Sequence, residues 1–523
     1  MAPFATVHAP HGMVCSVDHL ASEAGVEMMR RGGTAADAAI AASAVLAVTS
    51  QHMCGMGGDL FALVHHRDGP PDVLNASGRA GSGADPDRLR AEGLTRIPLR
   101  GHIASVPVPG CVDGWLALHA RHGRLPLADV LDPAIGYAAG GFPASPTLAV
   151  SVRAVLDLQG ADDYRAQEIR PGTRIRRPGV AEALHAIVEG GRDAWYRGSF
   201  GDDLLALGNG EFVADDLARV HADWVEPLAV RAWGHDIWTV PPNSQGYLTL
   251  AGAWIAEGLD LPDDPDDPLW AHLLIESARH AAFDRIEVLH EHADGNALIA
   301  ADRLAARRAA IDPACAADLG DSYAGGGTMH LVAVDENRMG VSLIQSNAGG
   351  FGCGIVAPTS RVFLQNRGYG FSLVPGHPAE YGPGKRPPHT LSPALVTAPS
   401  GELDMVIGTM GGDAQPQILL QLLARLLHAG HAPAPAIAAG RFELVGGDTG
   451  FDTWEGRGRV SVVVEGHAPD GWADGLRSRG HDVRVGDAFT HGVGHAHVIR
   501  LTDDGVLAGA SDPRPRTGSA SGY

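Results

Sequence analysis

A threonine that follows a run of glycines is the residue of this sequence best placed for nucleophilic chemistry. Thr328 comes directly after Gly325, Gly326 and Gly327 and opens the strand-like run MHLVAVD. A hydroxyl is a weak nucleophile unless a base lies beside it, and the α-amine of an N-terminal residue can be that base. Scission of the Gly327–Thr328 bond by the Thr328 hydroxyl would create this amine. On the residues alone, a turn before a strand explains the pattern more often.

A second pair of residues could stabilise the charge that such a reaction develops. Gly411 and Gly412 stand together in the segment GTMGGD. Because neither residue has a side chain, two successive amide N–H groups can point at a developing oxyanion, and one such donor is worth roughly 3 to 4 kcal/mol in other enzymes. An ordinary turn is the alternative explanation of this pair.

Two other kinds of site find less support in the sequence. The glycines of CGMGGD (54–59) lack the Lys-Ser/Thr of a Walker loop and follow a predicted helix, so they do not indicate phosphate binding. The sequence has 26 histidines, including His65 and His66, but no H-E-x-x-H spacing. We therefore expect no metal and no organic cofactor, and metal-dependent hydrolysis remains an alternative.

The elements that position these residues follow from hydrophobic periodicity and capping signals. Asp18 is predicted to cap a helix over 20–31, and Thr34 with Asp37 forms a capping box for an Ala-rich helix over 35–49. The runs MHLVAVD and MGVSLIQS, separated by a polar turn, predict a β-hairpin that begins beside Thr328.

The rest of the chain predicts helices packed on antiparallel sheets. Residues from about 110 to 315 have mainly helical periodicity and are expected to form a covering layer. The C-terminal part supplies one strong amphipathic helix, QPQILLQLLARLLHAG, and further strands. These strands are SPALVTA, LDMVIGTMGG, VSVVVEG, HDVRV, AHVIRLT and GVLAGAS.

Composition limits the partners and the compartment. The formal net charge of -21 argues against a nucleic-acid or anionic-membrane partner, because like charges repel. The N-terminus has neither a basic nor an apolar signal-peptide region, and no stretch of about 18 apolar residues occurs, so we expect a cytoplasmic protein with no membrane association. The five cysteines include no C-x-x-C pair, which favours buried thiols over disulfides or zinc.

The run TMHLVAVDENRMGVSLIQSNAGGFGCGIVAP resembles the nucleophile segment of the γ-glutamyltranspeptidases, which are N-terminal-nucleophile hydrolases. The resemblance covers nearly the whole chain in order, including GMGGDLFAL, PPNSQGYLTL, GKRPPHTLSPALV and GTMGGDAQPQ. It implies an α+β fold, a four-layer αββα sandwich with two antiparallel sheets between helical layers. It also implies self-cleavage into residues 1–327 and 328–523, whose two fragments stay associated as one interlaced domain.

The same resemblance implies the roles of the candidate catalytic residues. Thr328 matches the nucleophile, Ser346 matches the hydroxyl residue that assists it, and Gly411 and Gly412 match the glycine pair of the oxyanion hole. The implied reaction is hydrolysis or transfer of a small-molecule amide through an acyl-enzyme on Thr328.

The substrate-binding positions depart from the γ-glutamyl enzymes. Ser77 stands where an arginine clamps the donor carboxylate, and Arg79 lies two residues later, a shift of about 6 to 7 Å along a strand. Gly370 replaces the aspartate that pairs with the donor amine, and Arg367 stands nearby. A cation there would repel an α-ammonium and suit a carboxylate or a neutral acyl group.

These departures, with the wording SLIQSN and GTMGGDAQPQ, resemble the branch that contains oxamate amidohydrolase and cephalosporin-acylase-like members. A small acidic or neutral acyl amide is therefore the expected substrate. A true γ-glutamyltransferase or glutathione hydrolase that uses Arg79, and an inactive, uncleaved binding or scaffold protein, remain alternatives. The candidate substrate-binding residues are Ser77, Arg79, Asn347, Arg367, His389 and Thr390.

Overall fold

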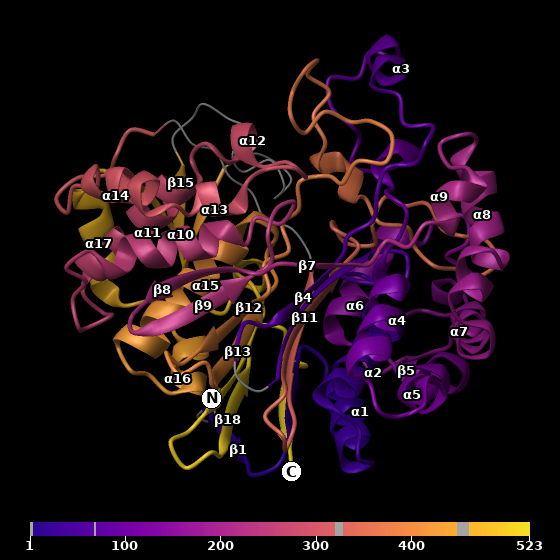
Figure 1. The fold of residues 1–523 in the computed structure, drawn as a ribbon, viewed down its shortest axis with the longest axis horizontal. Coiled ribbons are helices and arrows are strands. Elements are labelled where there is room, and N and C mark those ends of the chain that lie inside the picture. Colours follow the sequence, from indigo (N-terminus) through magenta and orange to yellow (C-terminus); the bar gives the residue numbers. More distant parts are fainter. Residues whose placement is uncertain (1–3, 67–68, 320–327, 447–459) are drawn as a thin grey trace.

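Two antiparallel β-sheets lie face to face between two layers of helices (Figure 1). The computed structural model describes residues 4–66, 69–319, 328–446 and 460–523. Within these residues each of the two large sheets has seven strands, and every neighbouring pair in them is antiparallel. The arrangement confirms the four-layer αββα sandwich expected from the sequence.

The first sheet has the order β1 (Val7–Ala9), β18 (Leu507–Ser511), β17 (Ala496–Leu501), β13 (Leu403–Thr409), β12 (Ala394–Thr397), β9 (His235–Thr239) and β8 (Leu228–Ala232). The second sheet has the order β19 (Ser519–Gly522), β2 (Met13–Ser16), β10 (Met329–Val334), β11 (Gly340–Ser346), β3 (Asp59–His65), β4 (Asp72–Ala76) and β7 (Asp223–Val225).

One helical layer covers the outer face of the second sheet and the other covers the first sheet (Figure 1). The first layer contains α1 (His19–Arg30), α2 (Ala35–Thr49), α4 (Cys111–His122), α5 (Leu127–Gly140), α6 (Pro146–Ser151), α7 (Pro178–Tyr196), α8 (Ser199–Gly208) and α9 (Ala214–Ala218). The second contains α10 (Tyr247–Glu257), α11 (Pro268–Ala282), α12 (Arg285–Val288), α13 (Gly295–Leu298), α14 (Ala301–Ala309), α15 (Gln415–Leu423), α16 (Pro433–Ala438) and α17 (Asp470–Ser478). The short α3 (Pro86–Ala91) stands apart from both layers (Figure 1).

Both faces of the central strands are buried, so their sequences are apolar throughout rather than alternating. In β10, Leu331 packs toward the helices of the first layer, whereas Val332 and Val334 pack between the two sheets. In β3, Leu60 packs toward the same helices, and Phe61 packs between the two sheets.

The predicted helix caps are confirmed. The Asp18 side chain accepts a hydrogen bond from the Leu20 N–H at the start of α1. Thr34 and Asp37 form the capping box of α2, and every residue of α2 is buried. The small alanine side chains let this helix lie deep between α1, α5 and the second sheet.

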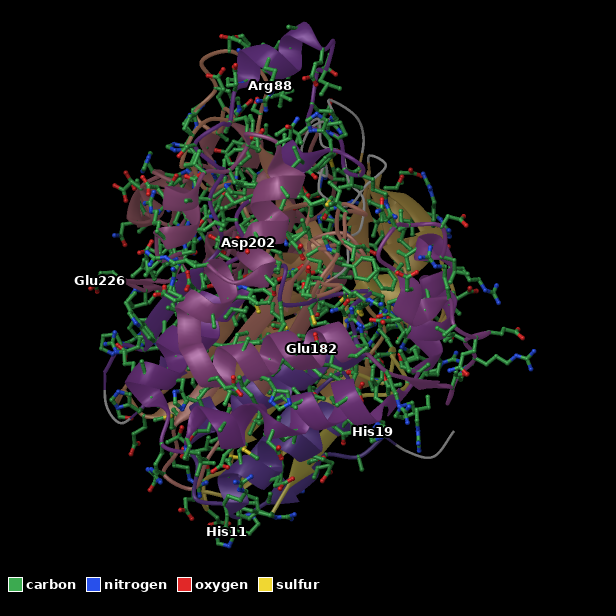
Figure 2. All side chains as sticks on the ribbon, turned by 90° about the vertical axis from the view of Figure 1, so that its right-hand side faces the viewer. His11, His19, Arg88, Glu182, Asp202 and Glu226 are labelled. Atoms are coloured by element: carbon green, nitrogen blue, oxygen red, sulfur yellow. The ribbon has the colours of Figure 1, made fainter. Side chains whose placement is uncertain are left out.

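Charged side chains lie on the outer surface of the helical layers. Glu182 on α7 and Asp202 on α8 are exposed and project from the face seen in Figure 2. Solvent therefore surrounds these two carboxylates. No described helix has both the length and the apolar character that crossing a bilayer requires.

Three segments differ from the sequence predictions. The region 110–315 also contains β7, β8 and β9, and the positive φ angles of Trp233 (48°) and Gly234 (76°) form the tight turn between the last two. The predicted strands 460–466 and 481–485 lie in a separate three-stranded sheet of β14 (Phe442–Val445), β15 (Ser461–Val464) and β16 (Asp482–Val485). The helix that begins at Gln415 changes to a π-helical turn at Ala424–His428.

Candidate active site

The β10–β11 hairpin brings Thr328 and Ser346 together. Met329 pairs with Gln345, so the next residues outward on the two strands, Thr328 and Ser346, lie opposite one another. Their hydroxyl oxygens are 3.1 Å apart, and both side chains are fully buried. The Ser346 Oγ also accepts a hydrogen bond of 2.8 Å from the Ala348 N–H. The predicted nucleophile and its predicted assistant are therefore in contact.

The hairpin packs on β13 so that its open end lies where β13 ends. At the closed end, a Cβ added to Gly340 would lie 2.6 Å from Leu403 Cδ2, at the start of β13. Further along, a Cβ added to Gly408 would lie 2.1 Å from the Nε2 of His330. The hairpin in the second sheet thus stacks on β13 in the first sheet. Thr328 lies toward the end of β13 that leads into the glycine pair.

The glycine pair forms a buried turn between β13 and α15. Gly411 has φ of 142° and Gly412 has φ of 56°, conformations that favour glycine, and a short 3-10 turn then leads into α15. Across the described ranges, neither amide N–H has an acceptor. Gln245 Nε2 donates to the Gly412 carbonyl at 3.1 Å and to the Thr390 carbonyl at 2.9 Å. This geometry suits an oxyanion-binding turn.

The glycines of the segment CGMGGD pack closely against the backbone near Ser346. A Cβ on Gly58 would lie 2.0 Å from the Ser346 carbonyl oxygen, and one on Gly57 would lie 2.2 Å from that of Phe363. The glycines are therefore required for close backbone packing beneath Ser346. Asn347 turns toward the same region, where its Nδ2 donates to the Gln51 carbonyl at 3.2 Å.

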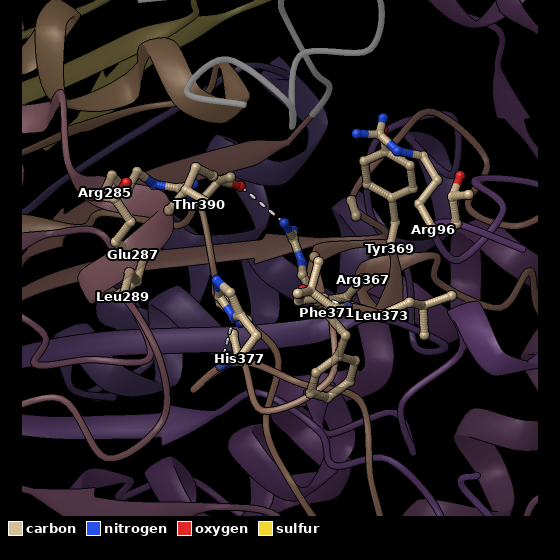
Figure 3. A pocket seen from close by; sticks show the side chains of 18 of the residues that line it. Arg96, Arg285, Glu287, Leu289, Arg367, Tyr369, Phe371, Leu373, His377 and Thr390 are labelled. Carbon is tan, nitrogen blue, oxygen red and sulfur yellow. Dashed lines mark hydrogen bonds between the residues drawn. The ribbon is translucent and has the colours of Figure 1, made fainter. Parts of the chain in front are cut away.

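A cavity of about 770 Å³ opens beside these elements (Figure 3). Ala348, two residues after Ser346, contributes to its wall. The other walls come from 283–289, from 366–374 and from the segment that contains Thr390. A cavity of this size holds a small molecule.

A buried ionic network lies behind one wall of the cavity. The Asp59 Oδ2 accepts hydrogen bonds from His389 Nε2 at 2.6 Å and from Arg367 Nε at 3.1 Å. Arg367 Nη1 donates to Thr390 Oγ1 at 2.9 Å, as Figure 3 shows. Asp59 pairs with Ser346 across β3 and β11, so the network lies next to the hydroxyl pair.

Burial keeps His389 neutral within this network. Burial lowers the pKa of His389 to about 4, so the imidazole is neutral near pH 7 and its Nε2–H donates to Asp59. The Leu391 N–H donates to the other ring nitrogen at 3.2 Å. Burial alone would raise the pKa of Asp59, but His389 and Arg367 beside it lower that pKa below its ordinary value. Asp59 was not predicted from the sequence; its position directly after Gly57-Gly58 was the available signal.

A second arginine–carboxylate pair was also missed by the sequence analysis. Arg285, the first residue of α12, lines the cavity and lies 3.2 Å from the carboxylate of Asp413. Asp413 directly follows the glycine pair. No motif in the sequence links these two residues, which are 128 positions apart.

The predicted substrate-binding residues separate into two groups. Arg367 and Thr390 line the cavity, and His389 lies immediately behind them. Arg79 is held in ion pairs with Glu291 and Asp223 and does not line the cavity.

Ser77 and Asn347 also lie outside the cavity lining. The Ser77 hydroxyl donates to Asn75 Oδ1 at 2.6 Å, and the side chain is buried. Gly327, the predicted residue before the scissile bond, lies outside the described residues.

Two groups of side chains in the described ranges have ligand atoms within 4.8 Å of one another, as a metal site requires. One contains His66, Asp72 and His122, and the other contains His272, Glu276 and His481. In each group the carboxylate already forms an ion pair with an arginine. Neither group lines the cavity.

The αββα fold is that of the N-terminal-nucleophile amide hydrolases. The family model for γ-glutamyltranspeptidase matches residues 21–523, and the chain belongs to this family. It is 35% identical to the oxamate amidohydrolase proenzyme of Klebsiella pneumoniae over 98% of both chains. It is 34% identical to the glutathione hydrolase-like YwrD proenzyme of Bacillus subtilis, over 96% of this chain and 97% of that one.

A solved structure has the same architecture. The cephalosporin acylase from Bacillus halodurans superposes with a TM-score of 0.89 at 31% identity, covering 99% of this chain and 97% of that chain. The protein is therefore an amide-hydrolysing enzyme of the γ-glutamyltranspeptidase family, similar to amidohydrolases and acylases.

Proposed function

We propose that this enzyme cleaves itself before Thr328 and then hydrolyses a small amide through an acyl-enzyme on the Thr328 hydroxyl. The observation that carries the proposal is the buried 3.1 Å contact between the Thr328 and Ser346 hydroxyls. It lies at the end of the hairpin that faces the Gly411–Gly412 turn. A nucleophile, an assisting hydroxyl and two amide donors then surround one reacting carbonyl.

In the first reaction the Thr328 oxygen attacks the Gly327 carbonyl carbon. The C–O bond forms and the C–N bond breaks, and the nitrogen, which keeps its own proton, takes the proton lost by the Thr328 hydroxyl and becomes the new α-amine. Water then hydrolyses the ester and leaves a carboxylate on Gly327. The products are the fragments 1–327 and 328–523, which stay associated.

In the second reaction the α-amine accepts the proton of the Thr328 hydroxyl as its oxygen attacks the substrate amide. The amides of Gly411 and Gly412 donate to the oxyanion, and the Ser346 hydroxyl donates to or accepts from the Thr328 oxygen. The leaving amine takes the proton, and water releases the acid from the acyl-enzyme. An amine in place of water would give transfer.

The lining of the cavity suits a small acidic or neutral acyl group better than a γ-glutamyl group. Arg367 and Thr390 occupy its wall, and Arg79 is held elsewhere by two carboxylates. The similarity to an oxamate amidohydrolase supports the same substrate class.

Intact-mass spectrometry of the purified protein tests the proposal, beside the variants Thr328→Ala and Thr502→Ala. We expect two fragments from the wild type and from Thr502→Ala, which removes an exposed hydroxyl, and one intact chain from Thr328→Ala. A wild-type chain that stays whole after long incubation would refute the mechanism and favour an inactive scaffold.

A further inference from the structure

The guanidinium of Arg285 is a buried cation that faces the cavity with few protein partners. Its side chain is 5% exposed, and its Nη2 lies 3.2 Å from the Asp413 carboxylate, with which it forms an ion pair. Within the described part of the chain, its Nε–H is buried and has no acceptor. A buried donor without an acceptor is costly, so the site suits an anion that the ligand brings.

Arg367 supplies a second cation to the same wall. Figure 3 shows Arg285 and Arg367 on either side of Thr390, and Arg367 donates to the Thr390 hydroxyl at 2.9 Å. Burial and then the nearby positive charge of Arg285 both lower the pKa of Arg367, which places the two guanidinium groups within electrostatic reach.

The carboxylates that balance these arginines do not occupy the cavity. Asp59 and Asp413 are fully buried, and neither is part of the cavity lining, whereas both arginines are. Glu287 also lines the cavity, but it is exposed, so solvent screens its charge. The charge that faces the cavity at this wall is therefore positive.

The arginine wall is joined to the glycine pair by short links. Asp413, the partner of Arg285, is the residue after Gly412. Gln245 donates to the carbonyls of both Gly412 and Thr390. The ion-pair partner of Arg285 is thus adjacent in sequence to the glycine pair. Thr390, whose hydroxyl accepts from Arg367, shares the Gln245 amide with Gly412.

We infer that Arg285 and Arg367 form a carboxylate subsite, so that the enzyme acts on amides of short acids that carry a second carboxylate a few bonds from the scissile carbonyl. This inference rests on the proposed function, because it assumes that the reacting carbonyl lies at the Gly411–Gly412 amides. Arginine forks bind carboxylates through paired hydrogen bonds, which gives the position of the second carboxylate as well as its charge.

The test compares charged and neutral forms of the same amides. Oxamate and succinamate are assayed beside their methyl esters with the wild type, Arg285→Met and Arg285→Lys. Arg231→Met, which removes an exposed arginine on β8, is the control. Self-cleavage of each variant is measured by intact mass, so that a loss of processing is distinguished from a loss of substrate binding.

We expect the wild type to prefer at least one free acid over its ester by about 100-fold or more in kcat/KM, because a polar site rejects a ligand that lacks its partner group. Arg285→Met should lower this preference to within about tenfold, mainly through KM, and Arg285→Lys should recover part of it. If a cleaved wild type hydrolyses the acids and their esters equally well, the carboxylate subsite is refuted. It is also refuted if Arg285→Met lowers kcat/KM for the acids and for the esters by the same factor. A wild type that does not cleave itself would instead refute the proposed function.

Discussion

Ser346 and Ser342 lie on the same face of β11, and each hydroxyl contacts a side chain from the neighbouring strand segment. The Ser346 Oγ lies 3.1 Å from Thr328 Oγ1, and the Ser342 Oγ lies 3.0 Å from His330 Nε2. Both serines are fully buried. The chain thus offers two similar hydroxyls in two similar environments, of which one touches the proposed nucleophile.

This relationship gives a matched pair of variants. Ser346→Ala should slow both self-cleavage and turnover by about 10- to 100-fold, because the Thr328 hydroxyl loses its hydrogen-bond partner. Ser342→Ala should lower the free energy of unfolding by about 1 kcal/mol and leave the cleavage rate within about threefold. Time courses by mass spectrometry and urea unfolding measure the two quantities. Equal cleavage rates in the two variants would remove Ser346 from the mechanism.

The Gly411–Gly412 turn can be tested against a glycine of similar backbone strain. Gly411→Ala places a side chain at φ of 142° and should reduce turnover by about 100-fold or more, because the amide donors move. Gly430 has φ of 68° with no atom within 4 Å of an added Cβ. Gly430→Ala should therefore lose about 1 to 2 kcal/mol of stability and keep its activity. If both variants keep full activity, the turn is structural.

The buried histidine of the ionic network predicts a pH dependence of stability. The pKa of His389 is lowered to about 4, below that of an unfolded histidine, so the unfolded state binds the proton first as pH falls. The stabilising contribution of neutral His389 is complete above about pH 6.5 and is lost as pH falls to about 4, by on the order of 3 kcal/mol.

The variant His389→Gln keeps a donor for Asp59 but does not titrate. Between pH 7 and 4 its free energy of unfolding should fall less than that of the wild type, and the other buried histidines affect both proteins alike. Denaturant midpoints at a series of pH values measure the difference. Parallel curves would show that the pKa of His389 in the folded protein is not lowered from that of an unfolded histidine.

The choice of substrate separates this enzyme from a true glutathione hydrolase. We expect a γ-glutamyl anilide, with or without a dipeptide acceptor, to react at least about 100-fold more slowly than the best carboxylate amide. Arg79→Met should destabilise the fold slightly by breaking its ion pairs with Glu291 and Asp223 without creating or removing γ-glutamyl activity. Fast release of the anilide that depends on Arg79 would support the alternative.

Local signals predicted much of the architecture. The caps at Asp18 and Thr34 were predicted because a capping residue and its helix are neighbours in sequence. The β10–β11 hairpin was predicted for the same reason, and it fixes the contact between Thr328 and Ser346. Family resemblance supplied the αββα sandwich, which periodicity alone could not distinguish from other arrangements of helices on antiparallel sheets.

The cavity wall could not be predicted because it joins distant segments. Arg285 and Asp413 come from different parts of the chain, and although Asp413 belongs to GTMGGD, no motif contains Arg285. Asp59, Arg367 and His389 meet only after β3 and the 366–390 segment are placed side by side. The absence of the γ-glutamyl clamp residues could be read from the sequence, but the network of Asp59, Arg367 and His389 could not.

The strand order of the two sheets affects whether the cleaved enzyme can refold after it unfolds. In the second sheet, β10 and β11 lie between β2 and β3, and in the first sheet β12 lies next to β9, so both proposed fragments contribute interior neighbours. After cleavage, refolding from the unfolded state would be a bimolecular reaction between two chains, each of which lacks part of the hydrophobic cores. The enzyme would then reach its native state once, as a single chain, and its working lifetime would be set by its unfolding rate rather than by an equilibrium.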